Sequence, residues 1–236
     1  MMRTHLYNKM KKGIKIGLLG GIGPEATGHF YLKLIKRLQE EMLVKSNTDY
    51  PQIIINSIPA PELVHDKASK SDLEPYIKGL KELDSMKPEI IAMVCNTIHL
   101  YYRQLRREIK APMINLREEV GKYLHRNNIK RITVLGTPMT IKNKLFAFDN
   151  VENYDITQRE AEILSQAILN FNRGNYKYKS VVKRLIRKYL EMGAQKILLA
   201  CTETSLMAEG ASKDAIDTMN IMADRIANHY KATSFK

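Results

Sequence analysis

The sequence predicts an α/β protein with two similar domains, each built on a parallel sheet. Short apolar strands alternate with longer amphipathic helices along the chain, as in parallel sheets joined by right-handed crossovers. A strand that runs into a glycine turn and a threonine occurs at 16–27 and again at 132–140. An apolar strand that ends in cysteine occurs at 90–95 and again at 197–201. This weak internal repeat predicts two halves that face one another across a cleft.

The first half is expected to hold three buried strands. Each is a continuous apolar run, which is typical of parallel strands covered on both faces; the runs are 15–19, 53–55 and 89–94. Helices are expected where apolar side chains recur at helical spacing; these are 25–42, 73–86, a short helix ending near 109, and 118–126. Pro24 suits the first turn of the first helix. Residues 59–72 are expected to form a loop.

The second half repeats the alternation. Strands are predicted at 131–135 and 196–200, and a turn at 136–140. Helices are predicted by the same spacing of apolar residues at 157–172, 179–192 and 214–230. Because every strand is followed by a helix or turn, both sheets are expected to be parallel.

Composition places the chain among ordinary globular proteins. Its 236 residues are 44% hydrophobic and 27% charged, which excludes a disordered or fibrous chain. No apolar run reaches the roughly 18 residues needed to span a bilayer, and no signal-peptide pattern follows the basic start, so a cytoplasmic protein is expected. The 38 basic and 25 acidic residues leave a formal charge of +13, which attracts anions of any kind. No nucleic-acid-binding motif accompanies this charge.

Two cysteines, Cys95 and Cys201, are the leading candidates for chemistry. A structural disulfide is not expected in the cytoplasm, and without a CxxC pair neither is a zinc site. Both cysteines end predicted strands, where the ligands of parallel sheets collect. At such strand-to-helix turns, backbone N–H groups are expected to lower a thiol pKa from about 8.5 and to bind a carboxylate. Asn96, Thr97 and Thr202 add side-chain donors.

Two thiols on either side of one carbon can invert it without a metal or an organic cofactor. One, as thiolate, removes a proton from one face, and the other, as thiol, delivers a proton to the opposite face. Hydrogen-bond donors must stabilise the enolate that develops, and the two thiols share a single proton. His99 could assist either this scheme or nucleophilic attack by a lone cysteine.

Each of these residues also has a structural interpretation. A cysteine after a strand is often an inert part of the core, and His99 and Glu203 could serve only packing or capping. Gly21-x-Gly23-x-x-Ala26 loosely fits a dinucleotide-binding fingerprint, yet no acidic residue ends the second strand to hold a ribose. A non-catalytic protein that binds a small anion or nucleic acid therefore stays open as an alternative.

Four motifs in chain order resemble the aspartate/glutamate racemase family. The turn at 20–27 (GGIGPEAT) is similar to the family's opening loop, and 95–99 (CNTIH) to its first cysteine motif. Residues 201–203 (CTE) resemble the second cysteine motif, and 134–140 the loop between the two. The resemblance extends over essentially the whole chain from Lys15 onward.

The resemblance implies two α/β domains related by a pseudo-twofold axis, with the active site in the cleft between them. It implies a first domain of 13–115 with 210–236, because the C-terminal helix returns to it, and a second domain of 116–209; residues 1–12 form an extension without an assigned role. It implies PLP-independent racemisation of an acidic amino acid, most simply aspartate, by paired cysteines. Homodimers are common among such proteins, so a homodimer is expected. Without a binding motif or a long apolar run, no nucleic-acid or membrane partner is expected.

The family's pattern further implies which residues hold the substrate. Two of them, Gly21 and Gly23, belong to the glycine loop. The others are polar residues of the cysteine motifs and of the loop between them: Asn96, Thr97, Thr137, Thr140, Thr202 and Glu203. Thr27 and His99 are expected to support them. Pro59-Ala60-Pro61 replaces the polar or basic side chain that many members place after the second strand, so Arg173 or Lys177 is expected to hold the distal carboxylate. Glutamate or hydantoin racemisation, maleate isomerisation and malonate decarboxylation are the alternative reactions.

Overall fold

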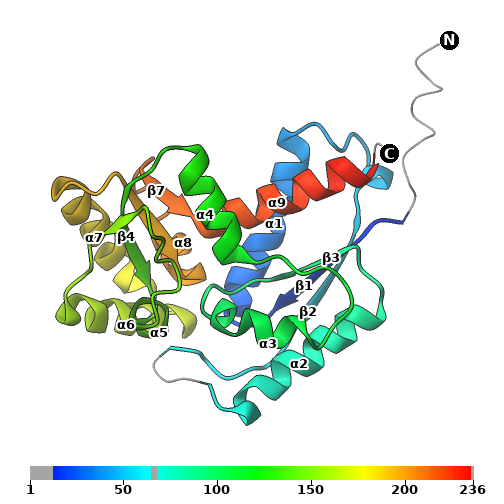
Figure 1. Cartoon of the computed structure of the whole chain (residues 1–236), viewed down its shortest axis with the longest axis horizontal. Coiled ribbons are helices and arrows are strands. Elements are labelled where there is room, and N and C mark those ends of the chain that lie inside the picture. The colour runs from blue at the N-terminus through cyan, green and yellow to red at the C-terminus, as the bar shows by residue number, and fades with distance from the viewer. Residues whose placement is uncertain (1–12, 65–67, 235–236) are drawn as a thin grey trace.

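The structure contains two parallel sheets, one in each half of the chain, which confirms the predicted fold class. The computed structural model describes residues 13–64 and 68–234. The first sheet has the order β2-β1-β3, with β1 at Lys15–Gly20, β2 at Gln52–Ser57 and β3 at Ile90–Met93. The second has the order β5-β4-β6-β7, with β4 at Arg131–Gly136, β5 at Glu152–Asn153, β6 at Lys196–Ala200 and β7 at Ala215–Asp217. Figure 1 shows one sheet in each half of the molecule.

Helices connect the strands and cover the sheets. The first half contains α1 (Pro24–Glu40), α2 (Lys70–Ser85), α3 (Tyr102–Arg106) and α4 (Leu116–Arg126), with 3-10 helices η2 (Asn47–Asp49) and η3 (Thr97–Tyr101). The second contains α5 (Pro138–Lys142), α6 (Gln158–Asn172), α7 (Lys179–Glu191), α8 (Thr202–Met207) and α9 (Thr218–Ser234), with the 3-10 helix η4 (Tyr176–Tyr178). Each long helix buries one apolar face; in α1 this face includes Phe30, Leu34 and Leu38, at the fourfold spacing from which the helix was predicted.

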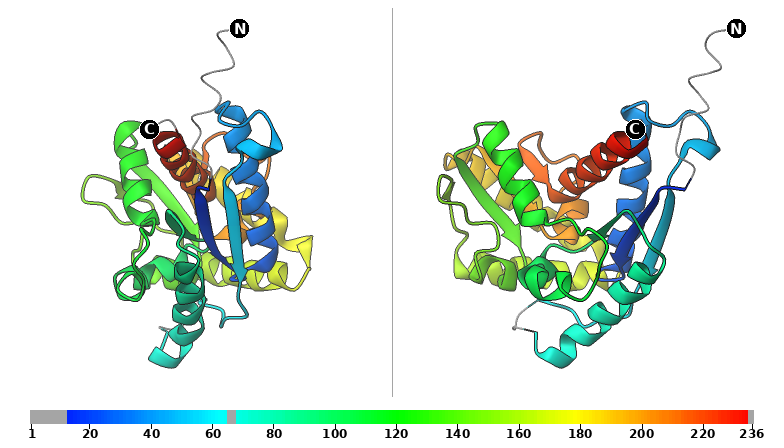
Figure 2. Two further views of the ribbon diagram at one scale, coloured as in Figure 1. Left: turned by 90° about the vertical axis from the view of Figure 1, so that its right-hand side faces the viewer. Right: turned by 45° about the vertical axis from the view of Figure 1, so that its right-hand side comes forward.

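The C-terminal helix α9 joins the two halves. It packs against α1 of the first half and against α8, β6 and β7 of the second, and Figures 1 and 2 show it running from β7 along α1. A single apolar core extends from β1 through α9 to β4 and β6, and it includes Ile16, Ile226, Val134 and Leu198. Because the two sheets share this core, their strand ends are held in one fixed arrangement.

Residues 210–236 contain a short strand that the sequence does not predict. This strand, β7, pairs in parallel with β6 and so belongs to the second sheet, and α9 packs on α1. The sequence favours one helix over 214–230 because a strand of three residues is too short to show a period. Asp217 is the last residue of β7 and caps α9, since its Oδ1 accepts the N–H of Met219 in the first turn of that helix at 2.9 Å.

The turn predicted at 136–140 overlaps the short helix α5, which continues to Lys142. Thr137 caps this helix by accepting the N–H of Thr140 at 3.2 Å, and Pro138 occupies its first position. The two-residue strand β5 carries no pattern from which it could be predicted. In the part of the chain that the structure describes, no helix has both the length and the apolar character needed to cross a membrane.

Candidate active site

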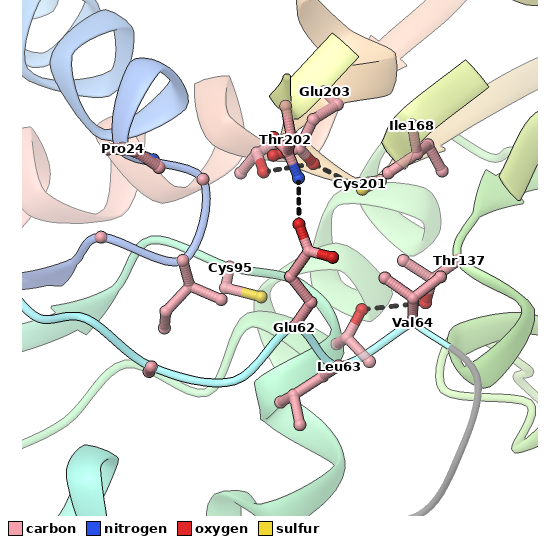
Figure 3. A pocket seen from close by; sticks show the side chains of 16 residues that line it. Pro24, Glu62, Leu63, Val64, Cys95, Thr137, Ile168, Cys201, Thr202 and Glu203 are labelled. Atoms are coloured by element: carbon pink, nitrogen blue, oxygen red, sulfur yellow. Dashed lines mark hydrogen bonds between the residues drawn. The ribbon is translucent and has the colours of Figure 1, made fainter. Parts of the chain in front are cut away.

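A cavity of about 200 Å³ lies between the two halves, at the carboxyl ends of the strands. The loops after β1 and β2 and the segments that follow β3, β4 and β6 enclose it (Figure 3). Most of the predicted site residues line this cavity, namely Gly21, Gly23, Cys95, Thr97, Thr137, Cys201, Thr202 and Glu203. The fold therefore brings the two cysteine motifs and the glycine loop into one site.

Cys201 and Glu203 are joined by a hydrogen bond at this cavity. The Cys201 thiol donates to Oε2 of Glu203 at 2.7 Å, and the Thr202 hydroxyl donates to the same oxygen at 2.8 Å. Cys201 is the N-cap residue of α8 and has an extended backbone. Glu203 is only 4% exposed, and burial raises the pKa of its carboxyl despite these two hydrogen bonds. Its carboxylate is therefore placed to accept a proton from Cys201.

Both thiols have raised pKa values, which corrects the expectation that their turns would lower them. Burial raises the pKa of Cys95 to about 12, and the Glu203 charge acts in the same direction. The backbone N–H groups of Ile98 and Thr97 lower it, but by less. Burial is also the main reason that the pKa of Cys201 lies well above its usual value, with further contributions from Glu203 and Cys95. Loss of solvation at the sulfurs outweighs the adjacent N–H groups.

Three buried threonine hydroxyls connect the two halves beside the cavity. Thr97 follows Cys95 in the first half, whereas Thr137 and Thr140 follow β4 in the second. The Oγ1 atom of Thr97 lies 3.0 Å from that of Thr137 and 3.0 Å from that of Thr140. The latter two are 3.2 Å apart. Thr97 and Thr137 line the cavity and can donate to a bound carboxylate, while Thr140 orients them from behind its wall.

The glycine loop after β1 fits closely against its neighbours. Gly23 has a φ of 84°, and a Cβ at this position would contact Oε1 of Glu203. Gly21 has a φ of 87°, and a Cβ there would lie 2.6 Å from the backbone nitrogen of Ile58. The Thr27 hydroxyl fixes the loop, because it accepts the N–H of Gly21 at 3.0 Å and donates to the Gly23 carbonyl at 3.1 Å. Both glycines are thus required by conformation and by space.

Two polar residues of the cavity, Glu62 and Asn172, lie outside the predicted site. Glu62 belongs to the loop after β2, and Asn172 is the last residue of α6. Figure 3 shows the Glu62 side chain extending into the cavity, where its Oε1 accepts a hydrogen bond from the Asn172 amide at 3.4 Å. The position of Glu62 just beyond a parallel strand was the available signal, since ligands collect at such ends.

Other predicted residues do not reach the cavity wall. Asn96 is buried next to Cys95, and its Oδ1 has no hydrogen-bond partner among the described residues. His99 accepts the N–H of Leu116 at Nδ1 at 3.4 Å, and burial lowers its pKa to about 4, so the imidazole is neutral near pH 7. Arg173 is the exposed C-cap residue of α6, and Lys177 is exposed in η4. Neither cation lines the cavity.

The described residues supply proton-transfer groups and hydrogen-bond donors to this site. Both cysteines are free thiols. Within 13–64 and 68–234, no three His, Cys, Asp or Glu side chains are grouped in a way that could hold a metal ion. Two thiols, a buried carboxyl and several hydroxyls around one small cavity can transfer protons to and from a bound carboxylic acid.

Comparisons with known proteins show the family of the chain. The family model described as Asp/Glu/Hydantoin racemase matches residues 19–226. The chain is 26% identical over 230 residues to the broad specificity amino-acid racemase RacX of Bacillus subtilis (strain 168). The match covers 92% of this chain and 98% of that protein.

Two solved structures have a similar fold. An aspartate racemase homologue from Pyrococcus horikoshii OT3 is 27% identical and superposes with a TM-score of 0.71 over 92% of this chain and 99% of its own. The aspartate racemase of Picrophilus torridus is 19% identical, with a TM-score of 0.72 over 94% and 100% of the two chains. The chain therefore belongs to the Asp/Glu/hydantoin racemase family, as an isomerase that acts on amino acids.

Proposed function

We propose that the protein racemises an amino acid without PLP, by proton transfer between the substrate α-carbon and Cys95 and Cys201. The observation that carries this proposal is that two thiols, one from each half of the chain, line the same cavity. Both are free, buried thiols. A coupled pair that shares one proton is what a two-base reaction requires.

In the proposed reaction, one thiolate takes the α-hydrogen as a proton. The C–H bond breaks, and its electron pair is delocalised into the substrate carboxylate. The other thiol then gives its proton to the opposite face, which forms a C–H bond of inverted configuration and leaves that sulfur as the thiolate. The hydroxyls of Thr97 and Thr137 are the proposed donors to the carboxylate as its charge increases.

Glu203 is the proposed proton acceptor for Cys201. A thiol with a raised pKa is protonated near pH 7, so it must lose a proton before it can act as a base. The hydrogen bond from Cys201 Sγ to Glu203 Oε2, at 2.7 Å, provides a direct route for that proton. Burial raises the carboxyl pKa, which brings it closer to that of a thiol. Transfer then yields the Cys201 thiolate and a neutral Glu203.

Aspartate is the substrate that the sequence favours, and the names of two similar structures support it. The name of RacX supports a wider range of amino acids. Among the described residues, no Lys or Arg lines the cavity to hold the second carboxylate of an acidic substrate. Aspartate and glutamate must therefore be compared directly with neutral and basic amino acids.

The proposed oligomeric state, from the resemblance, is a homodimer. The location proposed from the sequence pattern is the cytoplasm, and no nucleic-acid partner is proposed. Light scattering from the purified protein should give a mass twice that of one chain. A mass equal to that of one chain at assay concentrations would contradict the dimer.

The reaction is tested by chiral chromatography of L-amino acids incubated with protein that has been treated with hydroxylamine and dialysed to remove any PLP. Wild-type protein should form the D-enantiomer. Cys95→Ser and Cys201→Ser should each lower kcat/KM by about 10²- to 10⁴-fold, the usual contribution of a general acid or base. Circular dichroism checks that both variants are folded. Racemisation retained by either folded variant would contradict the two-base scheme.

A further inference from the structure

The loop that carries Glu62 is anchored on both sides of that residue. The Tyr76 hydroxyl donates a hydrogen bond to the Pro61 carbonyl. The N–H of Met139, from the second half of the chain, donates to the Val64 carbonyl at 3.1 Å. The Glu62 side chain itself is exposed, but its backbone is held by both halves. Its position at the cavity is therefore a fixed feature of the fold.

The Glu62 carboxylate adds a negative charge to the substrate cavity. Figure 3 shows the side chain pointing into the cavity, and the Asn172 amide holds Oε1 at 3.4 Å. Its charge reaches the catalytic motif, because it adds to the effect of burial in raising the pKa of Glu203. Glu62 and Glu203 are thus two acidic groups around one small space.

No described residue on the cavity wall balances these charges with a cation. The remaining lining residues are apolar, glycine or uncharged polar residues. The substrate α-carboxylate has its own proposed donors in the hydroxyls of Thr97 and Thr137. A second carboxylate on the substrate side chain would meet the like charge of Glu62, whereas a side-chain ammonium or guanidinium would form an ion pair with it.

We infer that Glu62 is a specificity residue that selects amino acids with a cationic side chain, such as lysine, ornithine or arginine, over aspartate and glutamate. The inference rests on the proposed racemase function and deepens it by naming the substrate class. Discrimination has two parts: attraction of the substrate cation and repulsion of a second carboxylate.

The experiment measures exchange of the α-hydrogen in D₂O by proton NMR, with L-lysine, L-norleucine and L-aspartate as substrates. L-Norleucine is the uncharged analogue of lysine. Wild-type kcat/KM should be at least about tenfold higher for lysine than for aspartate. Glu62→Gln should lower kcat/KM for lysine by about tenfold or more and change that for norleucine by less than about twofold.

Glu25→Gln is the matched control. Glu25 is an exposed acid at the start of α1 whose Oε2 accepts the Tyr176 hydroxyl at 3.0 Å, and it does not line the cavity. This variant removes the same charge near the site and should leave the preference for lysine unchanged. If Glu25→Gln and Glu62→Gln lower kcat/KM for lysine equally, the preference comes from the overall negative charge near the site and not from contact with Glu62. That result would overturn the inference.

Two other outcomes would also overturn it. Wild-type preference for aspartate over lysine contradicts the substrate class directly. Equal losses for lysine and norleucine in Glu62→Gln would show that Glu62 binds the α-ammonium group, which all amino acids share.

Calorimetric titration of wild-type protein and Glu62→Gln with lysine and aspartate tests substrate selection by Glu62 independently of the racemase reaction. If no amino acid exchanges its α-hydrogen but lysine binds in a Glu62-dependent way, the racemase proposal fails and the selection by Glu62 stands. If Cys95→Ser abolishes an exchange that is faster with aspartate than with lysine, the reaction stands and the selection fails.

Discussion

The Sγ atom of Cys201 lies 2.7 Å from Oε2 of Glu203 and donates a hydrogen bond to it, with the two residues 5% and 4% exposed. Cys95, in the other half of the repeat, has the backbone N–H groups of Ile98 and Thr97 beside it instead. In the described part of the chain, no side-chain carboxylate forms a hydrogen bond to Cys95. The two cysteine motifs are thus alike in position but different in how their protons can be removed.

Glu203→Gln should lower kcat/KM at pH 7 by about 10²- to 10⁴-fold, because glutamine keeps the size and one acceptor oxygen but cannot take the Cys201 proton. The assay is racemisation of the best substrate of the panel. Glu209→Gln, which changes an exposed glutamate just after α8, should keep wild-type activity. Glu203→Gln activity close to that of Glu209→Gln would remove Glu203 from the proposed proton path.

The pH dependence of kcat/KM should distinguish the titration of the Glu203 carboxyl from that of the two thiols. In wild-type protein the activity should rise through the pKa of Glu203, which burial places above the ordinary value of 4.5, and then stay level through neutral pH. The thiol pKa values are raised, so loss of the second proton should lower activity only in the alkaline range. In Glu203→Gln the rise should move into the alkaline range. A variant profile with the same acidic limb as wild type would contradict this assignment.

Gly23→Ala should reduce both activity and stability. Its Cβ would contact Oε1 of Glu203, and its left-handed backbone costs a non-glycine residue about 1–2 kcal/mol. Gly28→Ala is the control, since Gly28 is an exposed residue of α1 with open space around a Cβ. This variant should be more stable to unfolding than wild type by about 1 kcal/mol. Urea unfolding and kcat/KM measure the two effects. Full activity in Gly23→Ala would show that the loop does not position Glu203.

Thr97→Val should lower kcat/KM and destabilise the protein by about 1–3 kcal/mol, because it removes the hydroxyl that links Thr137 and Thr140 to the first half. Thr133→Val is the matched substitution. The Thr133 hydroxyl is buried in β4 without a hydrogen-bond partner in the described structure, so its loss should be neutral or stabilising. Equal destabilisation by the two substitutions, measured by urea unfolding, would argue against the threonine cluster as a link between the halves.

The main elements could be predicted from the sequence because their patterns are local. The stripe of Phe30, Leu34 and Leu38 indicates both the helix α1 and its buried face. Ala215–Asp217 could not be recognised as a strand, because its pairing with β6 depends on contacts distant in sequence.

The cysteine pair could be proposed because the same strand-and-cysteine pattern occurs twice. The direction of the thiol pKa shifts could not, because burial depends on the whole assembled fold. Glu62 carries no periodic signal; its place in the cavity follows from the anchored loop. Arg173 has the charge needed to hold a carboxylate but is an exposed helix cap.

The position of deuterium after brief turnover in D₂O tests the two-thiol reaction most directly. Each enantiomer of the best substrate is incubated separately, and both enantiomers are recovered and analysed by mass spectrometry. If Cys95 and Cys201 act on opposite faces, the product should carry solvent deuterium at its α-carbon while the remaining substrate keeps its original hydrogen, whichever enantiomer is supplied. Deuterium appearing equally in recovered substrate and product would indicate one base serving both faces and would contradict the account.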